Sequence, residues 1–326
     1  MNEFKPEASR ITTVSARLAL PEHGCYAAYV GLDVHKETIA VAVAEPGRQE
    51  PRSEGEIANR PKSVEKLVRR LSERFGGGVI QFVYEAGPCG YGLHHQLAGT
   101  GHACVVVAPS RIPKAPAERI KTDRRDALKL ARHARNGDLT PVWVPGPEQE
   151  AMRDLTRARG DMKVQERKAR QQLSAFVLRH GHAWSAGKTR WTAAHYAWLE
   201  SLKFAHDWQQ VVLQEYVDAA KAATRRVADL RAQMERALAS WSMAPVVVAL
   251  RGIDTLAAMV LLAELGDITR FDSPRQLMAF LGLVPSEHSS GGRRRQGGIT
   301  LTGNGHAGRI GLELPLPGAP DETPQA

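Results

Sequence analysis

Cysteine is scarce in this chain. The three cysteines, Cys25, Cys89 and Cys104, are odd in number, and their spacing matches no metal-ligand pattern. They are consistent with the reducing environment of the cytoplasm, where disulfides are rare. We therefore expect a cytoplasmic protein and assign no chemistry to its thiols.

Long hydrophobic runs are also missing. The longest apolar stretches, such as Leu256–Leu265, fall short of the roughly 18 to 20 residues that a membrane span needs. The N-terminus has neither the apolar core nor the cleavage pattern of a signal peptide. These absences predict a soluble intracellular protein with no membrane partner.

Positive charge, in contrast, is abundant. The 326 residues carry a formal net charge of +9, and lysine and arginine occur in clusters along the chain. This balance favours a polyanionic partner, with nucleic acid as the first candidate, although basic surfaces also occur on many other soluble proteins. The length is sufficient for two or three domains with hydrophobic cores.

The most informative stretch is 29–44, which reads as strands Tyr29–Val34 and Thr38–Ala44 joined by a tight polar turn. Asp33 lies between Leu32 and Val34, nearer the centre of its strand than the end. An unpaired buried carboxylate is costly, so such a group usually has a cationic partner. We interpret Asp33 as the first ligand of a metal site; the alternative is an aspartate that only caps the turn.

An α/β pattern follows the hairpin. We expect a polar connection at 47–59, a helix at 61–75, a strand at 79–84, a short helix at 93–97 and a strand at 102–108. This order, β-β-α-β-α-β, predicts a sheet with helices packed on it. Glu85 stands at the C-terminal end of its strand, where functional residues of such sheets gather.

Two further acids follow in a short basic run. Asp123 and Asp126 are one helical turn apart, so both carboxylates can point at one spot. Acids at a helix N-terminus are also favoured by the helix dipole alone. Their neighbours Lys121, Arg124 and Arg125 can hold phosphate, and a metal-dependent nuclease requires this combination of acids and cations.

The second half of the chain is predicted to be helical. The proline-rich segment 141–147 marks a domain boundary. Beyond it, one seam keeps a heptad pattern over Leu213, Tyr216, Ala220, Ala223, Val227, Leu230, Met234, Ala237 and Trp241. The seam favours a coiled coil and self-association, with an ordinary amphipathic core helix as the alternative. Trp184, Trp191 and Trp198 also repeat by seven; we interpret them as packing residues rather than base-stacking platforms.

A short helix at 271–283 precedes a sharp change to a segment rich in serine, glycine and arginine, 286–300. A serine beside a glycine-rich loop can approach a nucleic-acid backbone, and the cations at 293–295 can neutralise phosphates. A flexible basic loop is the alternative interpretation. Residues 311–326 are polar and rich in proline, which predicts disorder.

Taken together, four motifs carry a family resemblance. They are GLDVHKE around Asp33, VYEAGP around Glu85, KTDRRDA with Asp123 and Asp126, and GLVPSEHSSGGRRRQGGIT followed by TGN. In this order the chain resembles, from about residue 29 to 307, the DEDD-type insertion-sequence transposases (the "IS one-ten" family), which are described as bridge-RNA-guided DNA recombinases.

The resemblance implies a fold and a division into domains. It implies an α/β RuvC-like domain of the RNase H fold at 29–146, an α-helical coiled-coil region at 147–242 and a small, mainly α C-terminal transposase domain at 243–307. An N-terminal arm at 1–28 precedes them, and an atypical, disordered tail at 308–326 follows.

The resemblance also implies a catalytic site. Four acids would hold a divalent metal, with magnesium as the expected ion: Asp33, Glu85, Asp123 and Asp126. The nucleophile would be Ser290, with Ser289 as the neighbouring alternative, and acids and serine would form a composite site across subunits. Six cations would contact nucleic acid: Lys121, Arg124, Arg125, Arg293, Arg294 and Arg295.

The implied partners are the double-stranded DNA of element ends and target, a non-coding guide RNA, and further copies of the chain in a homodimer or higher oligomer. Two other functions compete with guided transposition. One is a metal-dependent RuvC-like nuclease or junction resolvase without serine chemistry, and the other is an inactive nucleic-acid-binding remnant.

Overall fold

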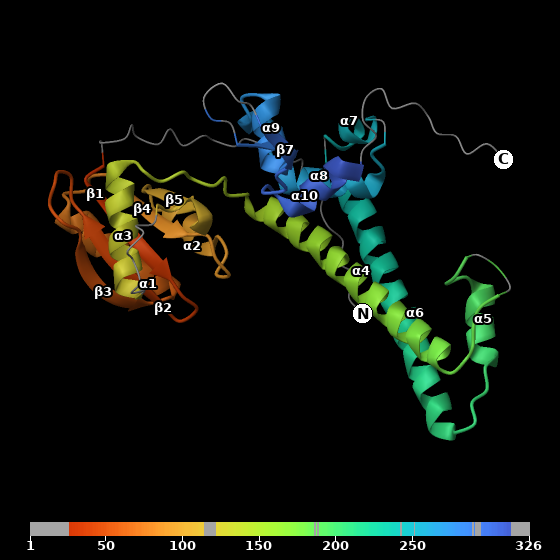
Figure 1. Cartoon of the computed structure of the whole chain (residues 1–326). Coiled ribbons are helices and arrows are strands. Elements are labelled where there is room, and N and C mark those ends of the chain that lie inside the picture. The colour runs from red at the N-terminus through yellow and green to blue at the C-terminus, as the bar shows by residue number, and fades with distance from the viewer. Residues whose placement is uncertain are drawn as a thin grey trace. The chain divides into compact units, whose positions relative to one another are not determined.

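A computed structural model describes residues 26–113, 122–185, 187, 189–241, 243–250, 252–288, 290 and 295–313. The described chain forms two compact units, one extending to Val144 and the other starting at Pro145 (Figure 1). We call them the sheet unit and the helical unit and describe each by itself.

A five-stranded mixed sheet with order β3-β2-β1-β4-β5 forms the centre of the sheet unit. The strands are β1 (Ala28–Val34), β2 (Thr38–Ala44), β3 (Arg52–Ala58), β4 (Ile80–Glu85) and β5 (Ala103–Val107). β1 pairs antiparallel with β2 and parallel with β4, so β1 joins the antiparallel and the parallel half of the sheet.

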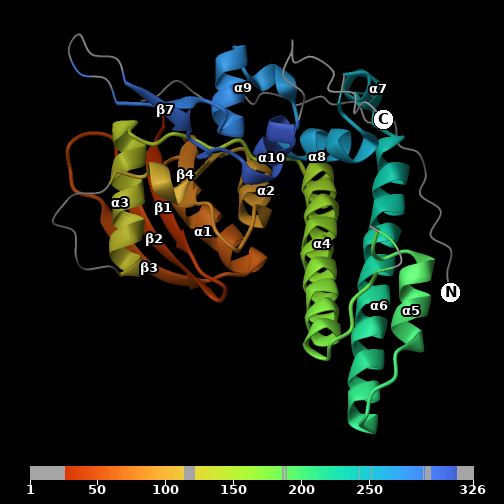
Figure 2. The ribbon, with the colours of Figure 1, turned by 45° about the vertical axis from the view of Figure 1, so that its right-hand side comes forward.

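Helices cover both faces of this sheet (Figure 2). They are α1 (Pro61–Arg74), α2 (Gly92–Ala98) and α3 (Asp123–Asn136), besides a 3-10 turn at Pro109–Arg111. One core cluster joins Val30 and Leu32 of β1 to the apolar side of α1 and α2. A second cluster joins Tyr29 and the opposite side of the sheet to α3, as the two-residue alternation of strand side chains requires.

The sequence prediction was right for the first hairpin and wrong for the segment after it. The register pairs Asp33 with Ala40 across β1 and β2. Residues 47–59, expected to be a polar connection, contain β3, which pairs antiparallel with β2. β3 is an edge strand with mostly polar, partly exposed side chains, and charged residues are common on such edges because they discourage aggregation. The strand therefore lacks the apolar pattern that would have identified it.

Gly31 sets how closely α3 approaches the sheet. A Cβ atom added at this position would lie 2.2 Å from the backbone oxygen of Ala127 and 2.5 Å from the backbone nitrogen of Ala131. Only glycine permits this contact. The contact holds the second and third turns of α3 against the middle of β1.

The helical unit begins with a long antiparallel pair of helices. Its elements are α4 (Pro147–Arg179), α5 (Ala193–Ser201), α6 (Asp207–Leu238), α7 (Ala244–Val248), α8 (Thr255–Leu265), a 3-10 turn at Ile268–Arg270, α9 (Pro274–Leu281), β6 (Pro285–Glu287), β7 (Gln296–Ile299) and α10 (Gly305–Glu313). α4 and α6 lie side by side in both views (Figures 1 and 2).

The heptad seam of α6 is buried within the chain. Leu213, Ala220, Val227 and Met234 are all nearly inaccessible to solvent. Leu213 and Ala220 belong to the cluster that includes Leu173 of α4. The seam is thus covered by the chain's own helices, and self-association stays a prediction.

A buried acid joins α4 to the C-terminal part of the helical unit. Glu264, at the end of α8, is fully buried and accepts hydrogen bonds from Nε of Arg157 at 2.9 Å and from Nδ2 of Asn304 at 2.8 Å. Nε of Arg153 donates to the backbone oxygen of Ala263. Burial raises the pKa of Glu264, but the hydrogen bonds from Arg157 and Asn304, together with the positive charges of Arg157 and Arg153, hold the pKa below its ordinary value.

The expectation of a disordered tail from 308 was wrong for its first residues, because α10 runs from Gly305 to Glu313. The side chain of Asn304 accepts hydrogen bonds from the backbone nitrogens of His306 and Ala307 and so caps this helix. Gly308 lies so close to Leu281 that an added Cβ atom would be 2.3 Å from its backbone oxygen. Residues 314–326 lie outside the described residues.

Within the described ranges, no helix combines the length and the apolar character that a membrane span requires.

Gly31→Ala should loosen α3. The new methyl group meets backbone atoms that cannot rotate away, so we expect a destabilisation of about 1–3 kcal/mol. Hydrogen–deuterium exchange of α3 peptides should quicken, and urea unfolding of the sheet unit should occur earlier. Gly160→Ala in α4 is the matched control: nothing lies within 4 Å of its added Cβ atom, and alanine should stabilise that helix by about 0.5–1 kcal/mol. Unchanged hydrogen–deuterium exchange of the α3 peptides in Gly31→Ala would contradict the role of Gly31 in holding α3 on the sheet.

Glu264 should make stability depend on pH. Its pKa is depressed in the folded protein from an ordinary value of 4.5, so its contribution is present above that pH and is lost as pH falls through the depressed folded-state pKa. Urea unfolding between pH 7 and pH 3 should show this loss in the parent chain. Glu264→Gln should be less stable at pH 7 and lack this part of the pH dependence, whereas Glu200→Gln, at an exposed ion pair with Lys221, should behave like the parent.

Candidate metal centre

Asp33 and His35 lie at the end of β1, where the strand turns into β2. Asp33 is the penultimate residue of β1, not a central one as the sequence suggested. The turn is fixed by hydrogen bonds that the backbone nitrogen of His35 donates to the oxygen of Thr38 and that Nδ2 of Asn59 donates to the oxygen of His35. These bonds hold both side chains at the C-terminal edge of the strand.

The first turn of α3 supplies two more acids. Thr122 caps the helix, because its side chain accepts a hydrogen bond from the backbone nitrogen of Arg125. Asp123 is the first helical residue, and Asp126 follows one turn later. Because Gly31 lets α3 pack closely on β1, this turn lies near Asp33.

Three potential ligands meet there. Nε2 of His35 is 3.3 Å from Oδ2 of Asp33 and 3.5 Å from Oδ1 of Asp123. One ligand atom of each residue lies within 4.8 Å of the other two. Asp33 is mostly covered, with 17% of its side chain exposed, whereas the side chains of His35 and Asp123 are about half exposed. The cluster is therefore open to solvent on one side.

The electrostatics of Asp33 reflect this crowding. Burial raises its pKa most, the attraction of His35 lowers it, and repulsion from Asp126 and Asp123 raises it again, so that the pKa lies above the ordinary value. Asp126 is therefore close enough for its charge to act on Asp33. A cation placed among these groups would relieve the repulsion.

Glu85 stands on the neighbouring strand. In the parallel register Leu32 pairs with Tyr84, so Asp33 and Glu85 follow at equivalent positions of β1 and β4. Val83 belongs to the core cluster beneath α3, and Glu85, two residues later, points to the same face. Glu85 is exposed and stands outside the close group of Asp33, His35 and Asp123.

The donor set suits a hard divalent cation. Carboxylate oxygens are the preferred ligands of magnesium and manganese, and magnesium usually keeps several waters beside one or two carboxylates. The arrangement provides two carboxylates and an imidazole in one open cluster, with two further acids on the same face of the sheet.

The remaining predicted site residues lie in different surroundings. Arg124 and Arg125 are exposed on the first turn of α3, beside the acids. Ser290 is exposed in the loop between β6 and β7 of the helical unit, and the backbone nitrogen of His288 donates to the oxygen of Arg295 across the base of this loop. Four of the predicted residues lie outside the described residues: Lys121, Ser289, Arg293 and Arg294.

His35 was missed by the sequence reasoning, which treated it as a turn residue. The signal was present: residues two apart in a strand point to one face, so a histidine two positions after Asp33 could have been assigned to the same site.

Comparison with known proteins places these observations in a family. Residues 30–181 match a family model described as a transposase, and residues 244–310 match the transposase IS116/IS110/IS902 family. A putative transposase, y4qE, of Sinorhizobium fredii (strain NBRC 101917 / NGR234) is 44% identical over 281 residues, which are 85% of this chain and 68% of that protein. The chain belongs to the IS110 family of transposases.

A second relative supports the same family assignment. The transposase for insertion sequence element IS1533 of Leptospira borgpetersenii is 32% identical over 256 residues, 77% of this chain and 73% of that protein. Among solved structures, a Thermus thermophilus RuvC structure matches with 14% identity and a TM-score of 0.25, covering 35% of this chain and 99% of that one. The two family models and the two transposase relatives confirm the predicted family resemblance.

We expect Asp33→Asn to weaken binding of Mn²⁺ by about 10–100-fold, as loss of metal-site support typically does, measured by isothermal titration calorimetry. His35→Gln should weaken Mn²⁺ more than Mg²⁺, because imidazole suits transition metals better. The control is Glu37→Gln, at an exposed acid of the same turn that lies 3.5 Å from Lys36. Equal affinities for parent, Asp33→Asn and Glu37→Gln would exclude this centre.

Proposed function

We propose that this family member carries out cut-and-rejoin transposition of an insertion sequence, with a RuvC-like domain of the RNase H fold as its metal-dependent centre. The observation that carries the proposal is the meeting of Asp33, His35 and Asp123 at one edge of the sheet. The family relationship supports a reaction on DNA. The acidic cluster supports metal-assisted chemistry at a phosphate.

The side chains have separate tasks in this proposal. Asp33 and Asp123, with Asp126 and Glu85 on the same face, would hold magnesium. Bound magnesium supplies positive charge that stabilises the oxygens of a phosphoryl group during transfer. Arg124 and Arg125, exposed beside the acids, would hold the flanking phosphates of the strand.

Ser290 is the proposed nucleophile. Its hydroxyl oxygen would form a bond to the phosphorus of one DNA phosphodiester while the bond from phosphorus to a sugar oxygen breaks. The serine proton leaves to a base, and the departing sugar oxygen takes up a proton and becomes a hydroxyl. The exposure of Ser290 supports this role, since a backbone phosphate could reach it.

The proposed partners follow from the same likeness. A non-coding guide RNA would pair with the element ends and the target, and the protein would hold the duplexes by shape and backbone. The net charge of +9 supports a polyanionic partner. A homodimer or higher oligomer would bring the acids of one copy and the serine of another to one strand.

A metal-dependent nuclease without serine chemistry is the second candidate. The observation favouring it is that Asp33, His35 and Asp123 gather within the sheet unit alone, as a nuclease centre needs no group from elsewhere.

One substitution separates these functions, and a second tests the metal centre that they share. Ser290→Ala should abolish the covalent protein–DNA adduct and strand exchange, because no oxygen remains to attack, while Mn²⁺ binding persists. Asp33→Ala should abolish all strand chemistry. Adducts are detected on denaturing gels with labelled element-end DNA, guide RNA and Mg²⁺, and Ser289→Ala is the neighbouring control.

Cleavage by Ser290→Ala without any adduct in the parent chain would support the second candidate and refute the serine. Salt-sensitive binding with no strand chemistry in any variant or metal would identify a binding remnant.

A further inference from the structure

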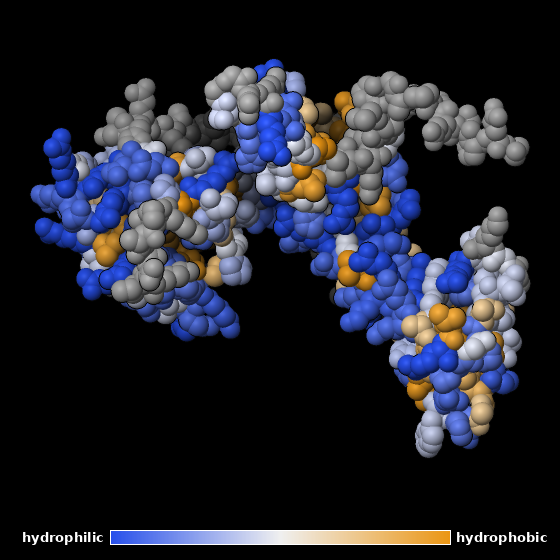
Figure 3. Space-filling model, viewed as in Figure 1, coloured by the Kyte–Doolittle hydropathy of each residue, from blue (hydrophilic) through white to orange (hydrophobic). Residues whose placement is uncertain are grey.

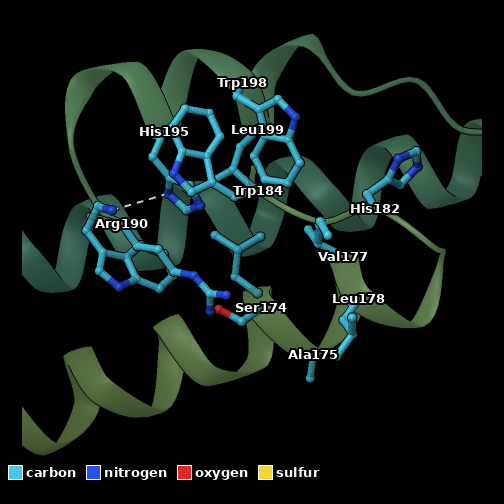
Figure 4. A pocket seen from close by; sticks show the side chains of 13 residues that line it. Ser174, Ala175, Val177, Leu178, His182, Trp184, Arg190, His195, Trp198 and Leu199 are labelled. Atoms are coloured by element: carbon cyan, nitrogen blue, oxygen red, sulfur yellow. Dashed lines mark hydrogen bonds between the residues drawn. The ribbon is translucent and has the colours of Figure 1, made fainter. Parts of the chain in front are cut away.

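The turn between α4 and α5 contains a cavity of about 160 Å³. Rings of Trp184, His195 and Trp198 gather on one side of it, opposite Ser174, Ala175 and Leu178 of α4 (Figure 4). Trp191 also lines the cavity. Pockets for drug-sized ligands have volumes of about 300–1,000 Å³. This cavity is smaller, so it suits a single planar group.

Aromatic rings form one wall of the cavity, and Arg190 also lines it. The ring centroid of His195 lies 5.2 Å from that of Trp184 and 5.1 Å from that of Trp191, and Trp184 lies 5.4 Å from Trp198. Nδ1 of His195 accepts a hydrogen bond from the backbone nitrogen of Trp191. Burial, with a contribution from the charge of Arg190, lowers the pKa of His195, so the ring is neutral at physiological pH.

One polar atom of the aromatic wall is a hydrogen-bond donor without an acceptor. Nε1 of Trp184 is buried and has no hydrogen-bond partner among the described residues. Buried donors normally have an acceptor. A ring nitrogen or carbonyl oxygen of a bound group would supply one.

A basic groove of about 840 Å³ along α4 adjoins the cavity, and both are lined by Ser174, Arg190 and Trp191. Six cations line the groove: Arg159, Lys163, Arg167, Arg170, Arg190 and Arg309. Figure 3 shows hydrophilic residues along α4 and hydrophobic ones gathered towards α5. Glu166 is the one acid of this lining.

The charge of Glu166 is already balanced. Nζ of Lys163 lies 2.7 Å from Oε2 of Glu166, and Arg170 lies 2.6 Å from Oε1. The guanidinium of Arg170 also stacks over the ring of Trp191 at 5.1 Å, which joins the basic groove to the aromatic wall. The net character of the groove is thus strongly positive.

We propose that this surface binds single-stranded nucleic acid, with the backbone in the basic groove and one unstacked base in the aromatic cavity. Proteins that bind single strands combine a positive groove with aromatic rings on which bases stack. A paired base in a duplex is stacked between its neighbours and cannot enter such a cavity. The positive charge of the groove disfavours an apolar peptide. The inference rests on the proposed nucleic-acid function and adds a binding site to it.

The first test is binding of the full chain to labelled oligonucleotides, followed by fluorescence anisotropy. The probes are a 12-nucleotide RNA, the same sequence as single-stranded DNA, and a blunt DNA duplex. Trp191→Ala should weaken binding of the single strands about tenfold, in the range expected for loss of one stacked base, and leave the duplex unaffected. Trp191→Phe should retain most of the affinity. The control is Trp208→Ala, at a tryptophan that is 81% exposed and lines neither the cavity nor the basic groove.

The second test addresses the groove. The double variant Arg167→Ala, Arg190→Ala should lower the slope of log affinity against log salt by about 1.4 for single strands, since each phosphate contact contributes about 0.7. Arg226→Ala, at an exposed cation on α6, should leave the slope unchanged. Tighter binding of the RNA or of the DNA probe would identify which strand the site serves, and both results support the proposal.

Equal single-strand affinity in the parent and Trp191→Ala would overturn the cavity as a base site. A change of oligomeric state in Trp191→Ala with unchanged affinity would assign the cavity to protein contacts instead. The adduct assay separates this proposal from the previous one, because Trp191→Ala should lose single-strand affinity whether or not the parent chain forms the covalent adduct.

Discussion

The close contact between α3 and β1 at Gly31 is the constraint on which the candidate centre depends. β1 is the central strand, and its register with β4 sets Glu85 beside Asp33. The acids of α3 reach the same edge only because helix backbone lies directly on strand backbone at Gly31. A larger residue would separate the two elements, and Asp123 would then no longer share a site with Asp33. A glycine without any chemistry of its own thus determines the geometry of the carboxylates.

The crowding of carboxylates around Asp33 destabilises the metal-free protein. Asp33 is largely covered, and the carboxylates of Asp123 and Asp126 raise its pKa further. The attraction of His35 lowers the pKa of Asp33, but burial and the two acids outweigh it. Repulsion of this kind is typical of sites that bind cations, because the bound ion turns the destabilising contacts into favourable ones. The helix dipole, which favours acids at the start of α3, offsets another part of the cost.

Much of the sheet unit could be predicted from the sequence, and the reasons for the failures are physical. The apolar runs were sufficient to predict β1 and β2, and the helical spacing of apolar residues was sufficient to predict α1. β3 did not, since an exposed edge strand needs no apolar face. The part of α10 after 307 was missed because the end of the chain is polar and rich in proline, which suggests disorder, whereas Gly308 is required by the contact with Leu281 and the helix is capped by Asn304. The acids were found from their motifs, and His35, two positions after Asp33, could have been added from the alternation of side chains along the strand. Trp191 and Trp198 do pack against the core of the helical unit, yet no periodicity could show that with Trp184 they also surround a cavity.

The two kinds of buried acid in this chain show how function and structure can be told apart. Glu264 and Glu166 are more deeply buried than Asp33, yet their pKa values are lowered, because arginine or lysine side chains donate hydrogen bonds to each of them. Their charge is satisfied within the fold, and their task is to join α4 to α8 and to α6. The pKa of Asp33 is raised, because its charged surroundings include other acids. A buried carboxylate whose charge is balanced by neighbouring arginine or lysine side chains has a structural role. One that is crowded by further carboxylates at a solvent-open edge still needs a cation, and this difference, more than any single motif, marks the edge of β1 as the reactive part of the sheet unit.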